Sequence, residues 1–233
     1  MSLLKNIFAD TLHLFYPHVC MGCGSDLLEE NNLLCLKCIN DLPHTGFAPH
    51  VNNPVEKYFW GRIALSAAHS EFYFSKGSLI QQLIHQLKYK GNIRLGYYLG
   101  ELMGISLLNS NRFNTVDALV PLPLYANKER IRGYNQAAVI CNGISSVMNI
   151  PIITGNIIRR HPTETQTLKH RTERWENVNE SFAVKIMASL KDRHLLLVDD
   201  VVTTGATLEA CGNVILQAEN VKLSIATLAH ASK

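Results

Sequence analysis

The sequence predicts an α/β protein in which a parallel sheet is flanked by helices, with a small cysteine-rich module near its N-terminal end. The first observation is a series of short apolar runs, near residues 117–121, 151–157, 195–200 and 222–228, with helical patterns between them. Strands that alternate with helices are typical of parallel sheets, whose strands are buried on both faces. The second observation is a pair of C-x-x-C motifs within residues 20–38.

Composition and charge narrow the class of protein. At 233 residues and 47% hydrophobic, the chain can form one sizeable core and a small appendage. The formal net charge is +3, but residues 1–60 hold three lysines against six acidic residues, so the basic charge belongs to the rest of the chain. No apolar run is long enough for a transmembrane helix, and no small-residue cleavage pattern follows the first residues, so we expect a cytoplasmic protein.

The two cysteine pairs predict a metal site made by Cys20, Cys23, Cys35 and Cys38. Two disulfides and a redox pair are the alternatives. A reducing compartment disfavours disulfides, and duplication of the motif at close spacing favours tetrahedral zinc over a redox pair. Four thiolates leave no open coordination position, so the zinc would be structural. Cys141 and Cys211 fall in helical patterns and are expected to be core residues.

Composition also divides the chain into two parts. Residues 3–15 have the apolar spacing of an amphipathic helix, and residues 41–57 are rich in Pro, Asn and His, which is typical of a linker. We therefore expect an N-terminal helix, the zinc ribbon and a linker over residues 1–57, and the α/β domain over residues 58–233. The acidic charge of the first part suits a protein partner better than a nucleic acid.

The elements of the larger part follow from its periodicity. Strand-like runs at 62–68 and 72–74 predict a hairpin. An amphipathic helix is expected over 79–87, closed by Gly91 as its C-cap, and a second helix over 94–108. A buried strand over 117–124, a helix beginning within 127–136, a strand over 150–158 and a last strand over 222–228 complete the pattern.

The stretch from residue 195 to residue 207 carries the strongest functional signal. An apolar run leads into two adjacent carboxylates, Asp199 and Asp200, and then through two valines into a small turn made by Thr203, Thr204, Gly205, Ala206 and Thr207. A helical pattern follows, so the turn lies at a helix N-terminus, where free N–H groups and the helix dipole bind anions. Ionised carboxylates only accept hydrogen bonds, which suits the two hydroxyls of a ribose. This order of residues predicts a ribose 5-phosphate site; an ordinary loop after a buried strand is the alternative.

The same stretch closely resembles the signature of type I phosphoribosyltransferases, which bind 5-phosphoribosyl 1-diphosphate (PRPP) with Mg²⁺. The resemblance implies that Asp199 and Asp200 hold the ribose hydroxyls and that residues 203–207 hold the 5-phosphate. It also implies that Arg132 and Gly133 meet the diphosphate, and that a basic loop over 159–171 closes over it. The loop's candidate cations are Arg159, Lys169 and Arg171. A solvated basic helix start and a solvated loop are the respective alternatives.

A four-cysteine module ahead of such a domain resembles the ComF family, and the resemblance covers nearly the whole chain. It is carried by the cysteine pairs, Leu87-Lys88-Tyr89-Lys90-Gly91, Arg132-Gly133-Tyr134-Asn135-Gln136, Thr165 and Leu168 with Arg171 and Asn177, and the run from Val198 to Thr207. The resemblance implies an association with DNA uptake in natural transformation, and many members carry amidophosphoribosyltransferase labels. Residue 1 is Met instead of a catalytic cysteine and Cys20 belongs to the metal pattern, which argues against glutamine-dependent chemistry.

Two functions are compatible with these residues. The first is an enzyme that transfers the phosphoribosyl group of PRPP to an acceptor that no pattern in the sequence identifies. The second is a non-catalytic, ligand-sensing DNA-processing protein that binds single-stranded DNA or a competence partner, with the basic part of the chain as the DNA-binding surface.

Overall fold

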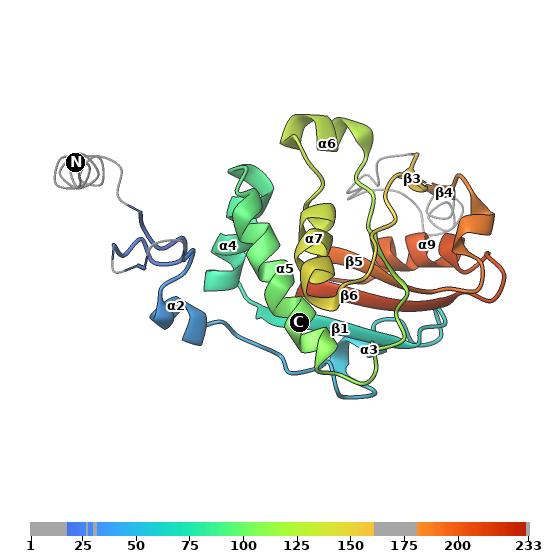
Figure 1. Cartoon of the computed structure of the whole chain (residues 1–233), viewed down its shortest axis with the longest axis horizontal. Coiled ribbons are helices and arrows are strands. Elements are labelled where there is room, and N and C mark those ends of the chain that lie inside the picture. Colours follow the sequence, from blue (N-terminus) through green and yellow to red (C-terminus); the bar gives the residue numbers. More distant parts are fainter. Residues whose placement is uncertain (1–17, 27, 30–31, 161–180, 232–233) are drawn as a thin grey trace, which may run out of the picture.

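A four-stranded parallel sheet with the strand order β1-β6-β5-β2 forms the centre of the molecule (Figure 1). The computed structural model describes residues 18–26, 28–29, 32–160 and 181–231. The strands are β1 (Ala67–Phe74), β2 (Ala118–Pro121), β5 (His194–Val202) and β6 (Lys222–Ala231). The predicted strands near 117, 195 and 222 are therefore confirmed. Their apolar side chains divide between two buried clusters, one on each face of the sheet.

Three long helices cover the first face of the sheet. They are α4 (Leu79–Tyr89), α5 (Ile93–Leu108) and α7 (Gln136–Met148), and the first two confirm the predicted helices. Gly91 has a φ of 68° directly after the α4 cap, as its predicted role at the helix end requires. The helices α5 and α7 cross at Gly100 and Gly143, where a Cβ on either residue would meet the backbone of the other helix.

The opposite face is covered by α9 (Ala206–Ile215) and by the segment that precedes β1. Residues 41–57 were expected to be a linker, but Phe47, Ala48 and Val55 are buried in the core. Asn53 caps the short helix α3 (Pro54–Lys57) and also donates to the carbonyl of Ala68 at 2.8 Å. This segment is thus packed against the sheet, and a domain division at residue 57 remains a proposal. The predicted N-terminal helix lies outside the described residues.

The predicted hairpin at 62–74 is wrong. Residues 67–74 form the single strand β1, which pairs in parallel with β6. The polar pair Ser70 and Glu71 interrupts the apolar pattern, which was interpreted as the end of a strand. Both residues are instead buried inside β1.

Glu71 is buried because it has polar partners on three sides. Its carboxylate lies 2.7 Å from His44 Nδ1, 2.9 Å from His69 Nε2 and 3.0 Å from the hydroxyl of Ser106 on α5. Burial raises the pKa of Glu71, but the hydrogen bonds from His44 and His69 outweigh burial and lower the pKa to about 2. The network connects the segment before α3, the edge strand and α5.

We expect Glu71→Ala to lower the free energy of unfolding by about 3 to 5 kcal/mol, because it leaves buried donors without an acceptor. Since the pKa of Glu71 is lowered from 4.5 to about 2, its contribution is complete above pH 4.5 and is lost as the pH falls toward 2. Urea unfolding at pH 7 and at pH 3 measures both effects. Glu219→Gln is the control, since Glu219 pairs with Lys191 on the surface and its loss should cost at most about 0.5 kcal/mol. Equal stability of Glu71→Ala and the control would refute this role.

The predicted strand at 150–158 is only partly formed. Ile152 makes one isolated parallel bridge to Leu119. The strand β3 (Ile157–Arg159) then pairs with β4 (Phe182–Val184) in an antiparallel ribbon outside the main sheet. The expected strand therefore splits, because the chain leaves the sheet edge after Ile152. The remaining short helices are α2 (Leu36–Asn40), α6 (Ala126–Arg132) and a 3-10 turn (Met187–Leu190).

Candidate functional site

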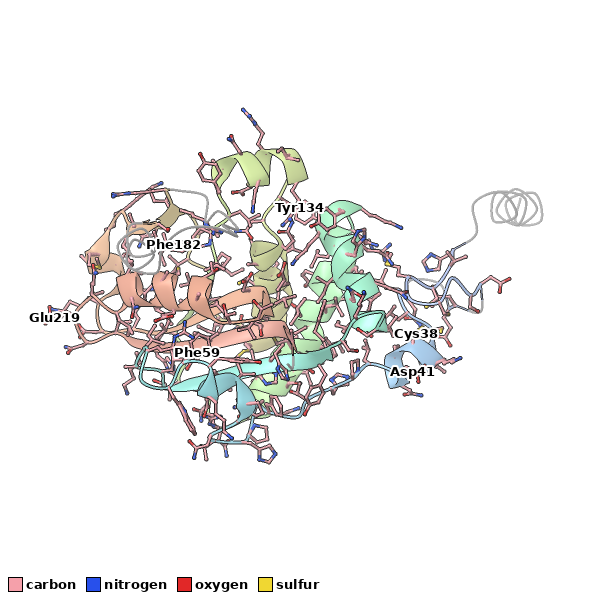
Figure 2. All side chains as sticks on the ribbon, turned by 180° about the vertical axis from the view of Figure 1, so that it is seen from behind. Cys38, Asp41, Phe59, Tyr134, Phe182 and Glu219 are labelled. Atoms are coloured by element: carbon pink, nitrogen blue, oxygen red, sulfur yellow. The ribbon has the colours of Figure 1, made fainter. Side chains whose placement is uncertain are left out.

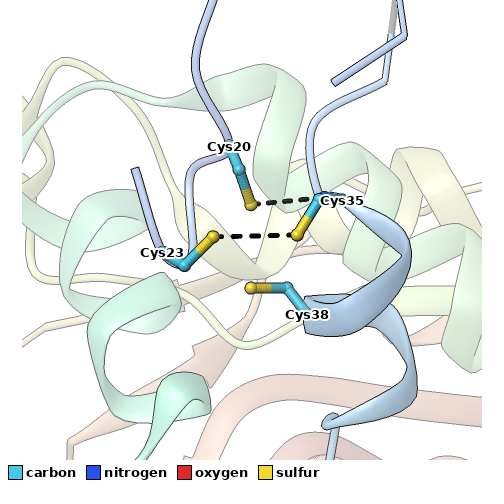
Figure 3. A group of neighbouring side chains, drawn as sticks. All are labelled: Cys20, Cys23, Cys35 and Cys38. Atoms are coloured by element: carbon cyan, nitrogen blue, oxygen red, sulfur yellow. Dashed lines mark hydrogen bonds between the residues drawn. The ribbon is translucent and has the colours of Figure 1, made fainter. Parts of the chain in front are cut away.

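The four cysteines predicted to bind metal lie together at the N-terminal end of the described chain. Their sulfur atoms are all within 4.8 Å of one another, and the Sγ atoms of Cys23 and Cys35 are 3.7 Å apart (Figure 3). Tetrahedral zinc with Zn–S bonds of about 2.3 Å requires S···S distances of about 3.8 Å, whereas a disulfide requires about 2.05 Å. The cluster is therefore compatible with a zinc ribbon. Cys141 and Cys211 are buried in the core, as predicted.

The backbone around the cluster favours a thiolate at Cys20. Burial raises the pKa of Cys20, but backbone N–H groups outweigh burial and lower the pKa to about 6. Two of these donors are Gly22 at 3.4 Å and Cys35 at 3.2 Å. Burial and the neighbouring thiols raise the pKa of Cys38, so the second negative charge is disfavoured without a cation. A dication would reverse this effect, which is the behaviour expected of a metal site.

The predicted acid pair lies near the carboxyl end of β5, where open parallel sheets bind ligands. Asp200 is only 8% exposed. Its Oδ1 forms an ion pair with Nζ of Lys88 on α4, at a distance of 2.8 Å. Asp199 Oδ1 accepts the backbone N–H of Asp200 at 2.8 Å. Burial, followed by repulsion from Asp200, raises the pKa of Asp199 to about 7.

The predicted phosphate turn follows directly, and residues 199 and 201–208 line a small hollow there. Gly205 has a φ of 76°, and a Cβ on it would lie 2.8 Å from Cε1 of Phe59. Helix α9 begins at Ala206, and within the described part of the chain no side chain caps it. The N–H of Ala206 makes only a long hydrogen bond, 3.5 Å, to Thr204 Oγ1. The start of the helix can therefore donate to an anion.

Two residues that were not predicted from the sequence, Phe59 and Arg62, contact the phosphate turn (residues 203–207) and hold it in place. Phe59 packs against Gly205. Arg62 donates from Nη1 to the carbonyl of Thr204 at 2.9 Å and to the carbonyl of Tyr58 at 2.8 Å, and it forms an ion pair with Glu209 on α9. Arg62 therefore fixes the turn between α9 and the segment before β1. Residues 62–68 were interpreted as part of a hairpin, so this contact had no signal in the sequence.

The predicted diphosphate residues lie at the end of α6. The guanidinium of Arg132 lies over the ring of Tyr89 at 5.5 Å and donates to Gln136. Gly133 ends the helix with a φ of 83°. The hydroxyl of Tyr134 donates to the carbonyl of Leu87, which connects this segment to the last turn of α4 (Figure 2). The last turn of α4 also carries Lys88, which contacts Asp200. The segment after α6 and the acid pair therefore both contact the last turn of α4.

Of the three predicted loop cations, the structure describes only Arg159. Its guanidinium lies over the ring of Phe182 at 5.4 Å, and its Nε has no hydrogen-bond partner among the described residues. Burial lowers the pKa of Arg159, whereas the negative charge of Asp199 raises it. Arg159 is therefore a cation on the Asp199 side of the site. Lys169 and Arg171 lie outside the described residues.

The amino-acid sequence is similar to a known domain family and to several known proteins. A model described as "Phosphoribosyl transferase domain" matches residues 135–233. "Competence protein F" of Haemophilus influenzae is 26% identical over 83% of this chain and 89% of its own length. "Competence protein ComFC" of Bacillus subtilis is 32% identical over 42% of this chain and 38% of its own. The competence names of these relatives and the matched domain support the ComF family for this chain.

Another relative of this chain is "DNA utilization protein YhgH" of Escherichia coli, 28% identical over 59% of this chain and 61% of that protein. The fold is that of a type I phosphoribosyltransferase domain, a parallel sheet flanked by helices, preceded by the four-cysteine cluster. Among solved structures, glutamine PRPP amidotransferase from B. subtilis has a TM-score of 0.38 at 14% identity, over 56% of this chain and 25% of that one. UMP synthase of Leishmania donovani has a TM-score of 0.35 at 19% identity, over 68% and 27%. At these scores the two likenesses add nothing to the assignment.

Within the described residues no helix is both long and apolar enough to span a membrane.

Proposed function

We propose that this ComF-family protein binds PRPP with Mg²⁺ and transfers its phosphoribosyl group to an acceptor. The observation that supports the proposal most is the continuity of acid pair and phosphate turn. Asp199 and Asp200 lie near the end of β5, and residues 201–205 lead from them to a helix start that has no side-chain cap within the described chain. A ribose 5-phosphate has its hydroxyls at one end and its phosphate at the other, which matches this order of acceptors and donors.

The cations around the acid pair suit the other half of the same ligand. Three cations from different elements are candidates for this role. Lys88 contacts Asp200, Arg159 interacts with Asp199 through its charge, and Arg132 lies over the ring of Tyr89, the residue after Lys88. Transfer would break the bond between the anomeric carbon and the diphosphate and form one to the acceptor. The cations would stabilise the negative charge that develops on the departing diphosphate, with Mg²⁺ neutralising part of that charge. No side chain needs to form a covalent intermediate.

The relatives named for competence and DNA utilization support a link of this function to DNA uptake. One surface favours single-stranded DNA as a second candidate ligand. Helix α6 stands away from the sheet and, although all of it is described, buries none of its residues (Figure 1). It carries Lys128, Arg130 and Arg132, and Arg132 lies over Tyr89, which is 68% exposed. Basic side chains beside an exposed aromatic ring are typical of single-strand binding surfaces.

Release of diphosphate from PRPP distinguishes the two functions. We would measure it with a panel of bases, amines and single-stranded oligonucleotides. An enzyme releases diphosphate with one acceptor class, whereas a sensor binds PRPP and releases none. If single strands bind at α6, Lys128→Met with Arg130→Met should weaken oligonucleotide binding at least tenfold and leave PRPP affinity unchanged. Absence of any PRPP binding by the wild type would refute the proposal.

A further inference from the structure

The peptide group between Thr204 and Gly205 is held from one side by Arg62. Arg62 Nη1 donates to the carbonyl oxygen of Thr204 at 2.9 Å and to that of Tyr58 at 2.8 Å. Its Nη2 pairs with the carboxylate of Glu209 in the first turn of α9. A guanidinium is a planar fork with fixed donor directions, so these three contacts fix the direction of the Thr204 carbonyl.

A fixed carbonyl also fixes the N–H group of the same peptide unit. In a trans peptide the C=O and N–H bonds lie in one plane and point in opposite directions. Because the Thr204 carbonyl points toward Arg62, the N–H of Gly205 points away from Arg62. Gly205 is one of the residues that line the hollow beside the turn, whereas among the described residues neither Arg62 nor Phe59 lines it. Arg62 and Phe59 thus contact the turn from the other side.

The next peptide unit is held by α9 itself. The N–H of Glu209 donates to the carbonyl of Gly205 at 2.8 Å, which is the first hydrogen bond of the helix. The N–H of Ala206 therefore points out of the helix start. Within the described part of the chain, the Gly205 N–H has no acceptor and that of Ala206 has only its long contact to Thr204 Oγ1. Successive free N–H groups of this kind form anion-binding nests.

Arg62 also offsets an unfavourable charge. The side chain of Glu209 is only 13% exposed and belongs to the first turn of α9. Its negative charge would repel an anion bound at the helix start. The ion pair with Arg62 neutralises this charge on the side of the turn that faces away from the hollow.

We propose that Arg62 is a positioning residue that directs the Gly205 N–H into the hollow and so aligns the phosphate turn for an anion. Arg62 does not touch the ligand. It acts through the peptide group between Thr204 and Gly205, and its neutralisation of Glu209 is a second, separable contribution. The inference rests on the proposed function in one respect, namely that the anion is the 5-phosphate of the ligand.

The direction of the Gly205 N–H can be measured without any ligand. Residual dipolar couplings of ¹⁵N-labelled protein give the orientation of each N–H bond relative to the sheet. In the wild type, the Gly205 coupling should fit the structure. In Arg62→Met, which keeps an unbranched side chain but removes the donors, it should no longer fit, whereas the couplings in β5 should stay unchanged. The same Gly205 coupling in both proteins would overturn the inference, whatever ligand the site binds.

Calorimetry with PRPP and Mg²⁺ separates the two contributions of Arg62. We expect Arg62→Met to bind about tenfold more weakly than the wild type or worse, because an N–H to an ionised phosphate is lost. Glu209→Gln should bind within about threefold of the wild type, since it removes a charge but no donor. The double variant lacks the repelling charge, yet it should still bind about fivefold more weakly than Glu209→Gln. Equal affinities of these last two proteins would show that Arg62 acts through charge alone and would contradict its positioning role.

The matched control is Arg112→Met. Arg112 makes the same kind of contact elsewhere, because its Nη1 donates to the carbonyl of His50 at 2.6 Å and its Nη2 pairs with Glu56 of α3. This variant should lose stability but keep the Gly205 coupling and the PRPP affinity, and thermal unfolding would show that each variant is folded. Equal losses of PRPP affinity in Arg112→Met and Arg62→Met would contradict the inference.

The inference and the proposed function can fail separately. Inorganic phosphate, followed through the amide signals of Gly205 and Ala206, should bind the wild type more tightly than Arg62→Met. If PRPP binds but Arg62→Met keeps the wild-type affinity for both ligands, the inference is wrong and the proposed function stands. A wild type that binds neither PRPP nor phosphate, but whose Gly205 coupling depends on Arg62 as expected, would refute the proposed function alone.

Discussion

Replacing Cys38 by serine is expected to abolish metal binding and to destabilise the first part of the chain. Structural zinc sites of this kind bind with about 10 to 16 kcal/mol in isolated peptides, so the effect should be among the largest in this protein. The module also packs on α4. Gln86 Nε2 donates to the carbonyl of Met21 at 2.6 Å, and a Cβ on Gly22 would lie 2.8 Å from both Cys38 Sγ and Leu79 Cδ1.

Zinc content by mass spectrometry and amide hydrogen exchange of α4 measure this effect. We expect one zinc per wild-type chain, none in Cys38→Ser, and faster exchange in the first turns of α4. Cys141→Ala is the control, because Cys141 is buried in the helix α7 and is not one of the four clustered cysteines. That variant should lose some stability but keep its zinc. A wild-type protein that contains no metal, yet unfolds at the same temperature after chelation, would contradict the metal site.

Gly205→Ala is expected to damage the phosphate turn. The φ of 76° is unfavourable for any residue with a Cβ and costs about 1 to 2 kcal/mol. The added Cβ would also lie 2.8 Å from Phe59, which must shift. Because Phe59 packs against the turn, we expect the free energy of unfolding to fall by about 2 to 4 kcal/mol in total. We also expect at least a tenfold loss of PRPP affinity.

Gly77→Ala separates these two causes. Gly77 has a φ of 78°, but a Cβ there would have no atom within 4 Å. The control should show the cost of the backbone alone and keep PRPP affinity. Urea unfolding and calorimetry on both variants give the comparison. Equal PRPP affinity of Gly205→Ala and Gly77→Ala would show that the turn does not hold the ligand's phosphate.

The features that the sequence predicted are those with a local signal. The strand β5, the turn at Gly205 and the helix α9 follow one another within a single stretch, so residue order alone indicated their arrangement. The cysteine cluster was also predictable from the sequence, because its two motifs lie close together in the chain. The hairpin error arose at Ser70 and Glu71, whose burial depends on His44 and Ser106 from distant segments.

The residues that were missed act through tertiary contacts. Arg62 reaches the carbonyl of Thr204 across 142 residues of sequence. Lys88 was noted as part of a motif, but its ion pair with Asp200 becomes visible only when α4 is packed beside β5. For Arg62 and Lys88, no pattern in the sequence indicates which residue the side chain contacts. The surroundings of the acid pair therefore required the folded structure.

In the proposed function, the acid pair and the following turn bind the ribose 5-phosphate half of PRPP. The most direct test is calorimetric titration of the wild type and of Asp199→Asn with Asp200→Asn, using PRPP and Mg²⁺. Asparagine keeps the size of each side chain but removes the negative charges and half of the acceptors. We predict binding by the wild type and no measurable binding by the folded double variant. Equal affinity of the two proteins would contradict the assignment of this site.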